Sequence, residues 1–349
     1  MAAVMGRCSG PLNRIGIGLT LALEGEARAD YALEIAGKPT EGFRVAHERC
    51  IVQPPTGPAY RFEIGNGEFS QPIPRLRPRV APDRLALYAA SATEEFRPVF
   101  DFLTSMHSYA IVPERLRELQ KPDSAQFLES DGGNAAAVLK RVQEQQWGNN
   151  HQRLCYLLSL IAEDIIGVEH QSVGPMETIR FIQDVGSEHP WHFDAVNMSD
   201  GILRMLGLLL AAYQPGEVSV LAIEEPEATI HPAAAEVVIE VLIHAANKRQ
   251  VLISTHSPDL LDFKELTDQQ LRVVTKQQGR TLIAPVSSVG AAAIRERVFT
   301  SGKLLREDEL EADPESARKA AEEVAIFGLP PVIEKVDEAG DHADLLYFQ

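Results

Sequence analysis

The chain has 349 residues and a net charge of -17, from 33 basic and 50 acidic side chains, and 45% of its residues are hydrophobic. Its mean hydropathy is -0.11. This acidic balance excludes a protein whose whole surface attracts nucleic acid or an anionic membrane, but it allows a local basic cluster. At about 100–200 residues per domain, the length fits one large domain or two smaller ones.

The cysteines and the lengths of the apolar runs indicate the cellular compartment in which the chain is expected. Cys8, Cys50 and Cys155 are too few and too scattered for a disulfide framework, and no cysteine or histidine pair has zinc-site spacing. We therefore expect a reduced, cytoplasmic setting. The longest apolar run, residues 205–213, is far shorter than the roughly 18–20 residues that span a bilayer, so we expect no membrane partner and no targeting segment.

Residues 1–84 have the texture of short strands and turns. Apolar residues alternate at period two in 15–23 and 31–35, and glycine-rich turn signals follow, which predicts an antiparallel β meander. Residues 71–82 form a Pro/Arg-rich connector, and the densest cationic cluster of the chain, Arg75, Arg77, Arg79 and Arg84, lies in it and directly after it. Arg75, Arg77 and Arg79 are its members within the connector. The cluster is either a solvated connector or a local patch that contacts DNA phosphates.

In residues 85–200 the apolar side chains recur at the spacing of a helix, and the loop 130–134 supplies a helix cap. We expect a helical subdomain here, with one strand-like piece at 179–185. The expected helices are 85–90, 95–106, 135–146 and 154–166.

Residues 201–305 read as an α/β core. The apolar runs 218–223 and 250–254 are typical of strands buried on both faces, and the helical segment 233–246 between them completes a βαβ unit. Further strands are expected at 271–275 and 281–284, and the acidic tail 306–349 is expected to be helical. The predicted fold class is α/β, combining the meander, the inserted helical subdomain and a parallel-sheet core.

Polar residues follow both core strands directly. Glu224 and Glu225 end the first strand, and Ser254-Thr255-His256-Ser257 ends the second. Ligands bind at strand ends in such sheets. Adjacent strand residues point to opposite faces, so one glutamate can approach a hydrated Mg²⁺ while the other orients water. His256 can donate to a phosphate or position water.

A third motif, Ser199-Asp200-Gly201, opens a strongly apolar helix. The free N–H groups and positive end of such a helix favour an anion. Serine and aspartate are also favoured as ordinary helix caps, so both interpretations stand.

In this order, the three motifs resemble the ABC-type ATPases, and most closely the RecF/SMC/OLD-like branch of predicted bacterial AAA ATPases. The resemblance implies an ATPase head that binds ATP and Mg²⁺ and works as a dimer. It implies Glu224 as the metal-side acid, Glu225 as the catalytic glutamate of a Walker B strand, and His256 as the switch histidine.

The same resemblance implies that Ser199, Asp200 and Gly201 form the signature loop, which contacts nucleotide held by the opposite protomer. It implies that His231 lies in a nucleotide-contacting D-loop.

One expected motif is missing. No GxxxxGK[ST] loop, whose N–H groups and lysine cradle phosphates, occurs in the sequence. Ser301-Gly302-Lys303 lies on the wrong side of the other motifs, and Pro39 follows Gly37-Lys38. In the family this loop precedes the meander, so we expect a chain that begins after it, through a truncation, a split subunit or true loss.

Three functional hypotheses remain. The first is an ATPase that couples ATP-driven dimerisation to DNA repair, DNA maintenance or phage defence. The second is an inactive scaffold or regulatory subunit that pairs with a P-loop-bearing ATPase as a heterodimer. The third is the ATPase subunit of an OLD-type nuclease, although residues 263–349 show no Asp-x-Asp at a strand end.

Overall fold

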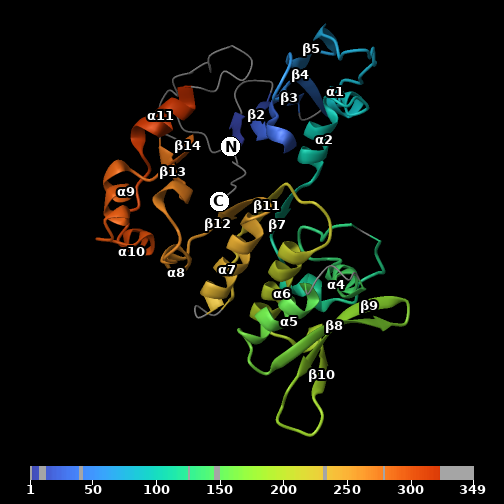
Figure 1. Cartoon of the computed structure of the whole chain (residues 1–349), viewed down its shortest axis with the longest axis vertical. Coiled ribbons are helices and arrows are strands. Elements are labelled where there is room, and N and C mark those ends of the chain that lie inside the picture. The colour runs from blue at the N-terminus through green and yellow to red at the C-terminus, as the bar shows by residue number, and fades with distance from the viewer. Residues whose placement is uncertain are drawn as a thin grey trace. The chain divides into compact units, whose positions relative to one another are not determined.

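The computed structural model describes residues 2–7, 13–38, 42–124, 126–144, 150–230, 234–277 and 280–322. The described chain forms two compact units. The first comprises the described parts of Met1–Ala22, Arg28–Ala86 and Pro314–Gln349, and the second comprises Leu23–Ala27 and Leu87–Asp313. The mixed α/β class is confirmed, with antiparallel and parallel sheets in the same chain (Figure 1).

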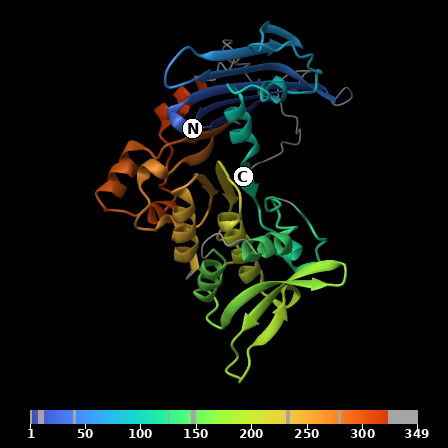
Figure 2. The same ribbon diagram turned by 45° about the vertical axis from the view of Figure 1, so that its right-hand side comes forward.

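The first unit holds the predicted antiparallel meander, whose strands lie in sequence order (Figure 2). The strand β4 shows why these residues form a sheet, because every second side chain from Ala46 to Val52 is buried. The helix α11 (Pro314–Glu322) also belongs to this unit. The strands are β1 (Ala2–Arg7), β2 (Asn13–Ala22), β3 (Arg28–Lys38), β4 (Gly42–Gln53), β5 (Tyr60–Gly65) and β6 (Glu68–Gln71).

A buried carboxylate lies on the inner face of the meander. Glu48 is fully buried, and it accepts a hydrogen bond from the Tyr31 hydroxyl at 3.1 Å and from the Ala86 amide at 2.5 Å. Burial, followed by the charge of Glu48, raises the pKa of the Cys50 thiol to about 12. The glutamate therefore ties strands β3 and β4 to the start of α1 (Ala86–Ala90).

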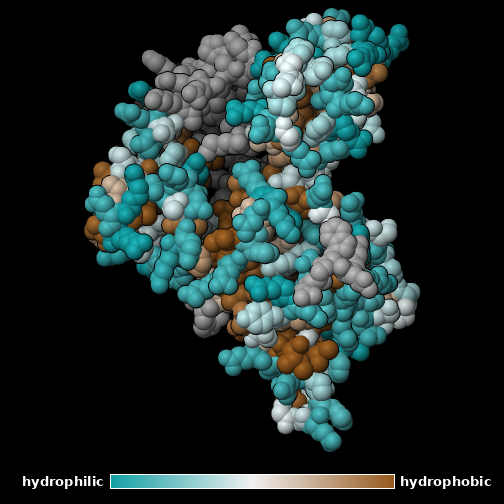
Figure 3. All heavy atoms as spheres, in the orientation of Figure 1, coloured by the Kyte–Doolittle hydropathy of each residue, from teal (hydrophilic) through white to brown (hydrophobic). Residues whose placement is uncertain are grey.

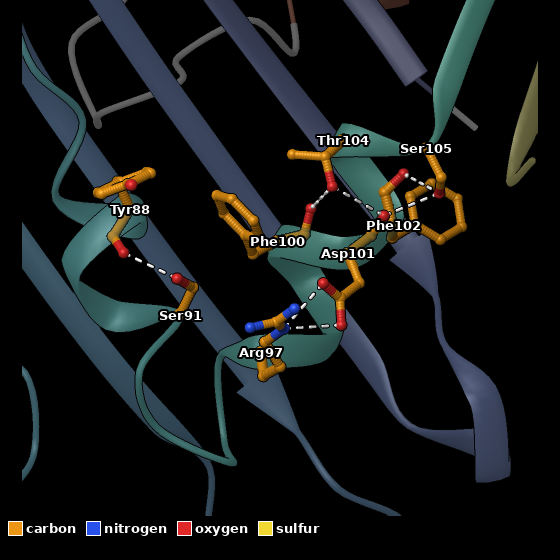
Figure 4. A network of polar contacts seen from close by, with 8 residues as sticks. All are labelled: Tyr88, Ser91, Arg97, Phe100, Asp101, Phe102, Thr104 and Ser105. Carbon is orange, nitrogen blue, oxygen red and sulfur yellow. Dashed lines mark hydrogen bonds and ion pairs between the residues drawn. The ribbon is translucent and has the colours of Figure 1, made fainter. Parts of the chain in front are cut away.

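The second unit contains most of α1 and then α2 (Arg97–Thr104), which Figure 4 shows from close by. Arg97 donates to both carboxylate oxygens of Asp101, at 2.8 and 2.9 Å. Ser105 donates through Oγ to the Asp101 carbonyl at 2.8 Å, and this bond closes the last turn. The chain then enters β7 (Met106–Tyr109).

The centre of the second unit is a three-stranded parallel sheet with the order β12-β11-β7. Its strands β11 (Val220–Glu224) and β12 (Gln250–Ser254) confirm the positions of the two predicted strands, and α7 (Ala235–Ala246) confirms the helix between them. The prediction that both strands are buried on both faces is wrong for β12, which lies at the edge of this sheet and exposes Leu252 and Ile253. The strand β7 corrects the sequence prediction, which placed Met106 in a helix. The helix α6 (Asp200–Tyr213) is buried on nearly every side and packs against α7, as an all-apolar helix must (Figure 1).

The segment 85–200 is less helical than the sequence predicts. It contains an antiparallel sheet with the order β10-β9-β8, so the helix expected at 154–166 ends at Ser159 and Ile165 already begins β8. Residue 166 lies in β8 because Ile165 and Val168 bury their side chains in the core beside Phe181 of β9. Its elements are α3 (Pro113–Arg117), α4 (Ala135–Glu144), α5 (Asn150–Ser159), β8 (Ile165–Val173), β9 (Met176–Gln183) and β10 (Trp191–Asp194).

After β12 the second unit ends in small elements. The hairpin β13–β14 confirms the strands expected near 271–275 and 281–284. No helix in the described part of the chain is long and apolar enough to cross a bilayer. The elements are α8 (Pro258–Leu261), β13 (Val273–Gln277), β14 (Arg280–Ala284), α9 (Ser288–Arg295) and α10 (Ser301–Arg306).

Candidate functional site

The parallel register of the central sheet brings two of the predicted motifs to one edge. Glu224 at the end of β11 pairs with Ser254 at the end of β12, and the Glu225 amide continues the ladder by donating to the Ser254 carbonyl at 2.9 Å. The glutamate pair and the His256 loop therefore leave the same edge of the sheet. Ligands of open α/β sheets bind at this edge.

Glu225 has a strained backbone. Its φ is 41°, in the left-handed region that non-glycine residues rarely adopt. Glu224 and Glu225 are both exposed, and neither carboxylate has a protein partner among the described residues. Strain of this kind costs roughly 1–3 kcal/mol and is concentrated at functional sites. The pair is therefore presented to solvent by a conformation that the surrounding fold must stabilise.

The loop after Glu225 is joined to the predicted switch. Pro226 is buried, and Glu227 accepts a short hydrogen bond from the Thr255 hydroxyl. Thr255 Oγ1 in turn accepts from the Ser257 amide at 2.9 Å. Sequence reasoning did not assign a role to Glu227 or Thr255. Only the register of the two strands reveals that they meet.

His256 is exposed and has no polar partner among the described residues, so its imidazole is available to a ligand. Its neighbour Ser257 accepts from the Leu260 amide at 3.4 Å and caps α8. The switch segment thus combines one available side chain with two that hold the loop in shape.

The N-terminus of α6 lies against the loop that follows β11. A Cβ on Gly201 would lie 2.8 Å from the carbonyl oxygen of Thr229, so the close approach requires glycine. Arg204, one turn further along α6, donates to the Glu225 carbonyl at 3.5 Å. Arg204 is a further site residue that the sequence did not reveal. These contacts bring the third predicted motif beside the glutamate pair.

Ser199 and Asp200 have local roles here. Ser199 is the N-cap of α6 and accepts from the Ile202 amide at 3.4 Å. Asp200 forms a short ion pair with Arg117, which also donates to the Met198 carbonyl at 2.9 Å. Both side chains are therefore used as an ordinary helix start uses them. His231 lies outside the described residues, so its predicted place in the D-loop has no structural counterpart here.

The residues at this edge fit one part of a Mg²⁺–nucleotide site. Glu224 and Glu225 supply carboxylate oxygens and His256 supplies an imidazole, which suits a hydrated Mg²⁺ whose remaining ligands are waters and phosphate oxygens. No group of three or more acidic, histidine or cysteine side chains in the described part of the chain is arranged to hold a metal alone. A phosphate cradle is missing from the sequence itself.

Ser301-Gly302-Lys303, the segment most like a phosphate loop, has a packing role. Thr300 caps α10 by accepting from the Lys303 amide at 3.2 Å. A Cβ on Gly302 would lie 2.1 Å from the Pro258 carbonyl oxygen, and the Lys303 ammonium lies 4.5 Å from the centre of the Phe299 ring. The glycine therefore allows α10 to pack against α8.

The arginine cluster lies in the first unit, on the connector that follows β6. Arg75, Arg77 and Arg79 are all exposed, and the residues between them are less so. Arg75 lies in a turn with a φ of 63°. None of the three has an acidic partner within the described residues. Nothing in the described contacts neutralises the cluster.

Comparison with known proteins gives one family match. The model of the family described as "AAA domain, putative AbiEii toxin, Type IV TA system" matches residues 71–262. This stretch covers the arginine cluster, both glutamates and the switch segment, and it ends at Asp262. No curated protein matches the chain.

Solved structures show only distant similarity. An SMC head domain from Thermotoga maritima is 14% identical, with 74% of each chain covered and a TM-score of 0.34. An Smc head domain with an extended coiled coil, bound to the C-terminal domain of ScpA from Pyrococcus furiosus, is 9% identical, with 79% of this chain and 82% of that chain covered and a TM-score of 0.33. At these scores the similarity identifies neither a shared activity nor a shared partner.

Proposed function

The chain belongs to the AAA-domain family whose model matches residues 71–262, and on that premise we propose that it is an ATPase head of the RecF/SMC/OLD-like branch. In this proposal the edge formed by Glu224, Glu225 and His256 acts on the γ-phosphate and the attacking water of ATP. The observation that carries the proposal is the register of Glu224 with Ser254, which presents these available side chains at one sheet edge.

Each residue has a proposed task. Glu224 holds water ligands of Mg²⁺, Glu225 accepts a proton from the attacking water, and His256 donates to the phosphate. Arg204 positions Glu225 through its carbonyl, and Thr255 positions the loop through Glu227. The phosphate cradle must come from outside these 349 residues, because they contain no GxxxxGK[ST] loop.

The proposed working form is a dimer, in which the N-terminus of α6 faces a nucleotide held by a second protomer with a P-loop. We place this dimer in the cytoplasm, where it couples ATP-driven closure to DNA repair, DNA maintenance or phage defence. DNA contact, in this proposal, uses the exposed and unneutralised Arg75, Arg77 and Arg79.

A second candidate, a catalytically inactive scaffold subunit, is favoured by one specific observation. Ser199 and Asp200 are occupied by a helix cap and an ion pair with Arg117, so the proposed signature residues are already satisfied within the protomer. In this case the chain contributes a surface to a P-loop-bearing ATPase and none of the chemistry.

The test uses the chain purified from its native cells together with any P-loop ATPase that co-purifies with it. We expect Glu225→Gln to lower Mg-ATP turnover of the complex by about 100-fold or more, as removal of a catalytic base does, while ATP binding persists. The matched control is Glu240→Gln, because Glu240 is an exposed glutamate on the neighbouring helix α7. It should leave turnover unchanged.

The outcomes separate the two candidates. Turnover that is equal in Glu225→Gln and the parent supports the scaffold and contradicts the catalytic role. A complex that neither binds nor hydrolyses ATP contradicts both. Turnover by the isolated chain that Glu225→Gln abolishes would contradict the inference that the cradle comes from elsewhere.

A further inference from the structure

A hollow of about 560 Å³ lies in the second unit, where α5 packs against β8, away from the sheet edge described above. Its wall includes His151, Cys155 and Tyr156 of α5 and Val168 and Glu169 of β8. Ile166, which also lines it, is 52% exposed. Figure 3 shows hydrophobic surface in brown in the part of the molecule where Figure 1 places α5, β8 and β10. The hollow is therefore open to small molecules from solvent.

His151 and Cys155 form a dyad in this wall. They lie one helical turn apart, and His151 Nε2 is 3.7 Å from Cys155 Sγ. The same Nε2 lies 2.8 Å from the carbonyl oxygen of Val168. A carbonyl oxygen can only accept, so Nε2 carries a proton. This one proton is directed to the Val168 carbonyl, and Cys155 Sγ lies beside the same N–H at the longer distance.

The charges around the dyad agree with this geometry. The hydrogen bond with Cys155 is the largest cause of a raised pKa at His151, and it outweighs the lowering by burial. Glu169 raises the pKa of His151 further, and His192 of β10 lies behind it, 3.9 Å from its carboxylate. The remaining titratable group in the lining is Tyr156. A histidine in hydrogen-bond contact with a partly buried thiol in an open hollow is the kind of setting in which cysteines react.

Cys50 provides an internal contrast. It is fully buried in the first unit, and burial followed by the charge of Glu48 raises the pKa of its thiol to about 12. A thiol of this kind is inert toward reagents in solution. Cys155 is only partly buried, lies in an open hollow and faces an N–H donor.

From this geometry we propose that Cys155 is a reactive thiol that hydrogen peroxide oxidises to a sulfenic acid, with His151 as its positioning residue. The thiolate sulfur attacks one peroxide oxygen, an S–O bond forms and the O–O bond breaks. The sulfur loses two electrons and the peroxide gains them. The leaving hydroxide takes a proton from the His151 imidazolium and departs as water. This site is independent of the proposed ATPase chemistry.

The test treats the full chain with hydrogen peroxide and traps sulfenic acid with dimedone, followed by peptide mass spectrometry. Cys8 lies outside the described residues, so all variants carry Cys8→Ser. We expect the dimedone adduct on Cys155 and none on Cys50. In His151→Gln the rate of adduct formation at pH 7 should fall by about fivefold or more, because the charged donor is gone.

A pH profile of iodoacetamide alkylation distinguishes this role from a structural one. The profile for Cys155 should move to higher pH in His151→Gln, at unchanged circular dichroism. The matched control is His192→Gln, which alters a histidine that touches Glu169 but not the sulfur, and it should give a much smaller change. Equal labelling of Cys155 and Cys50, no adduct on Cys155, or an unchanged profile in His151→Gln would each overturn the proposal.

Discussion

At the scale of single residues, the site depends on side chains whose roles are set by backbone conformation. Glu224 and Glu225 are neighbours with the same side chain, yet one completes a strand and the other adopts a φ of 41°. The sequence indicates that two acids follow an apolar run. Which of them is strained depends on the loop that turns away to meet Thr255.

Glycine substitution should separate the two glutamates. Glu225→Gly removes the left-handed strain, so we expect the free energy of unfolding to rise by about 0.5–1 kcal/mol. Glu224→Gly places glycine in a strand and should lower it by about 0.5–1 kcal/mol. Urea denaturation of both variants checks this. A loss of stability in Glu225→Gly as large as that in Glu224→Gly would show that the backbone is not strained.

The neutral histidine of β7 should make stability sensitive to acid. Burial lowers the pKa of His107 below its ordinary value of 6.5, and its Nε2 is buried without a partner among the described residues. Below about pH 6.5 the unfolded chain binds this proton more readily than the folded chain does. The free energy of unfolding therefore falls as the pH falls. The folded protein therefore incurs no penalty from this group well above pH 6.5.

His107→Phe should reduce this sensitivity. The new ring retains the contact that His107 makes with Phe127, whose ring centre is 4.4 Å away. Thermal melts at pH 8 and pH 5.5 should show a smaller drop in Tm for the variant than for the parent. An identical drop in both proteins would mean that His107 does not contribute to the acid sensitivity.

At the scale of elements, polar side chains join segments that pattern alone leaves separate. Gln214 at the end of α6 donates to the Tyr109 hydroxyl of β7 at 2.7 Å, and it accepts from the Leu128 amide at 2.7 Å. Glu48 does the same in the meander, for Tyr31 and Ala86. Such bonds stabilise because the alternative is a buried group without a partner.

Loss of the buried glutamate should therefore destabilise the meander. Glu48→Ala leaves the Tyr31 hydroxyl and the Ala86 amide unpaired and opens a cavity, and we expect a loss of about 2–4 kcal/mol. Glu34→Gln, which breaks a partly exposed ion pair with Arg14 in the same sheet, should cost less than about 1 kcal/mol. Chemical denaturation measures both losses. Equal losses would rule out a special role for Glu48.

At the scale of the whole molecule, the net charge of -17 and the exposed arginine cluster oppose each other. Long-range repulsion should weaken any contact with DNA, and Arg75, Arg77 and Arg79 offer a local attraction against it. Binding through this cluster should therefore be weak and strongly dependent on salt.

Replacement of the three arginines by alanine tests this. We expect the parent to bind duplex DNA at low salt with a log–log salt slope that the triple variant lowers by about 3, one counterion for each lost phosphate contact. Fluorescence anisotropy at several salt concentrations measures the slope. An unchanged slope would exclude these arginines from any DNA contact.

Local pattern alone was enough to predict much of the architecture. Alternation at period two in residues 15–23 predicts β2, and the apolar runs before Glu224 and Ser254 predict β11, β12 and their parallel pairing. Strongly periodic or continuously apolar segments suit few regular structures, which is why the position of β12 was predictable although most of its side chains are exposed. The polar residues that follow both strands predicted which side chains lie at one edge of the sheet, and their role there stays a prediction.

Only the tertiary structure decided the rest. The four residues of β7 carry no strand signal of their own, and they form a strand because β11 pairs with them. The contacts Glu227–Thr255, Arg204–Glu225 and Gly201–Thr229 join residues that are distant in sequence. Contacts of this kind depend on where the folded backbone places each group, and no spacing rule along the chain encodes that position.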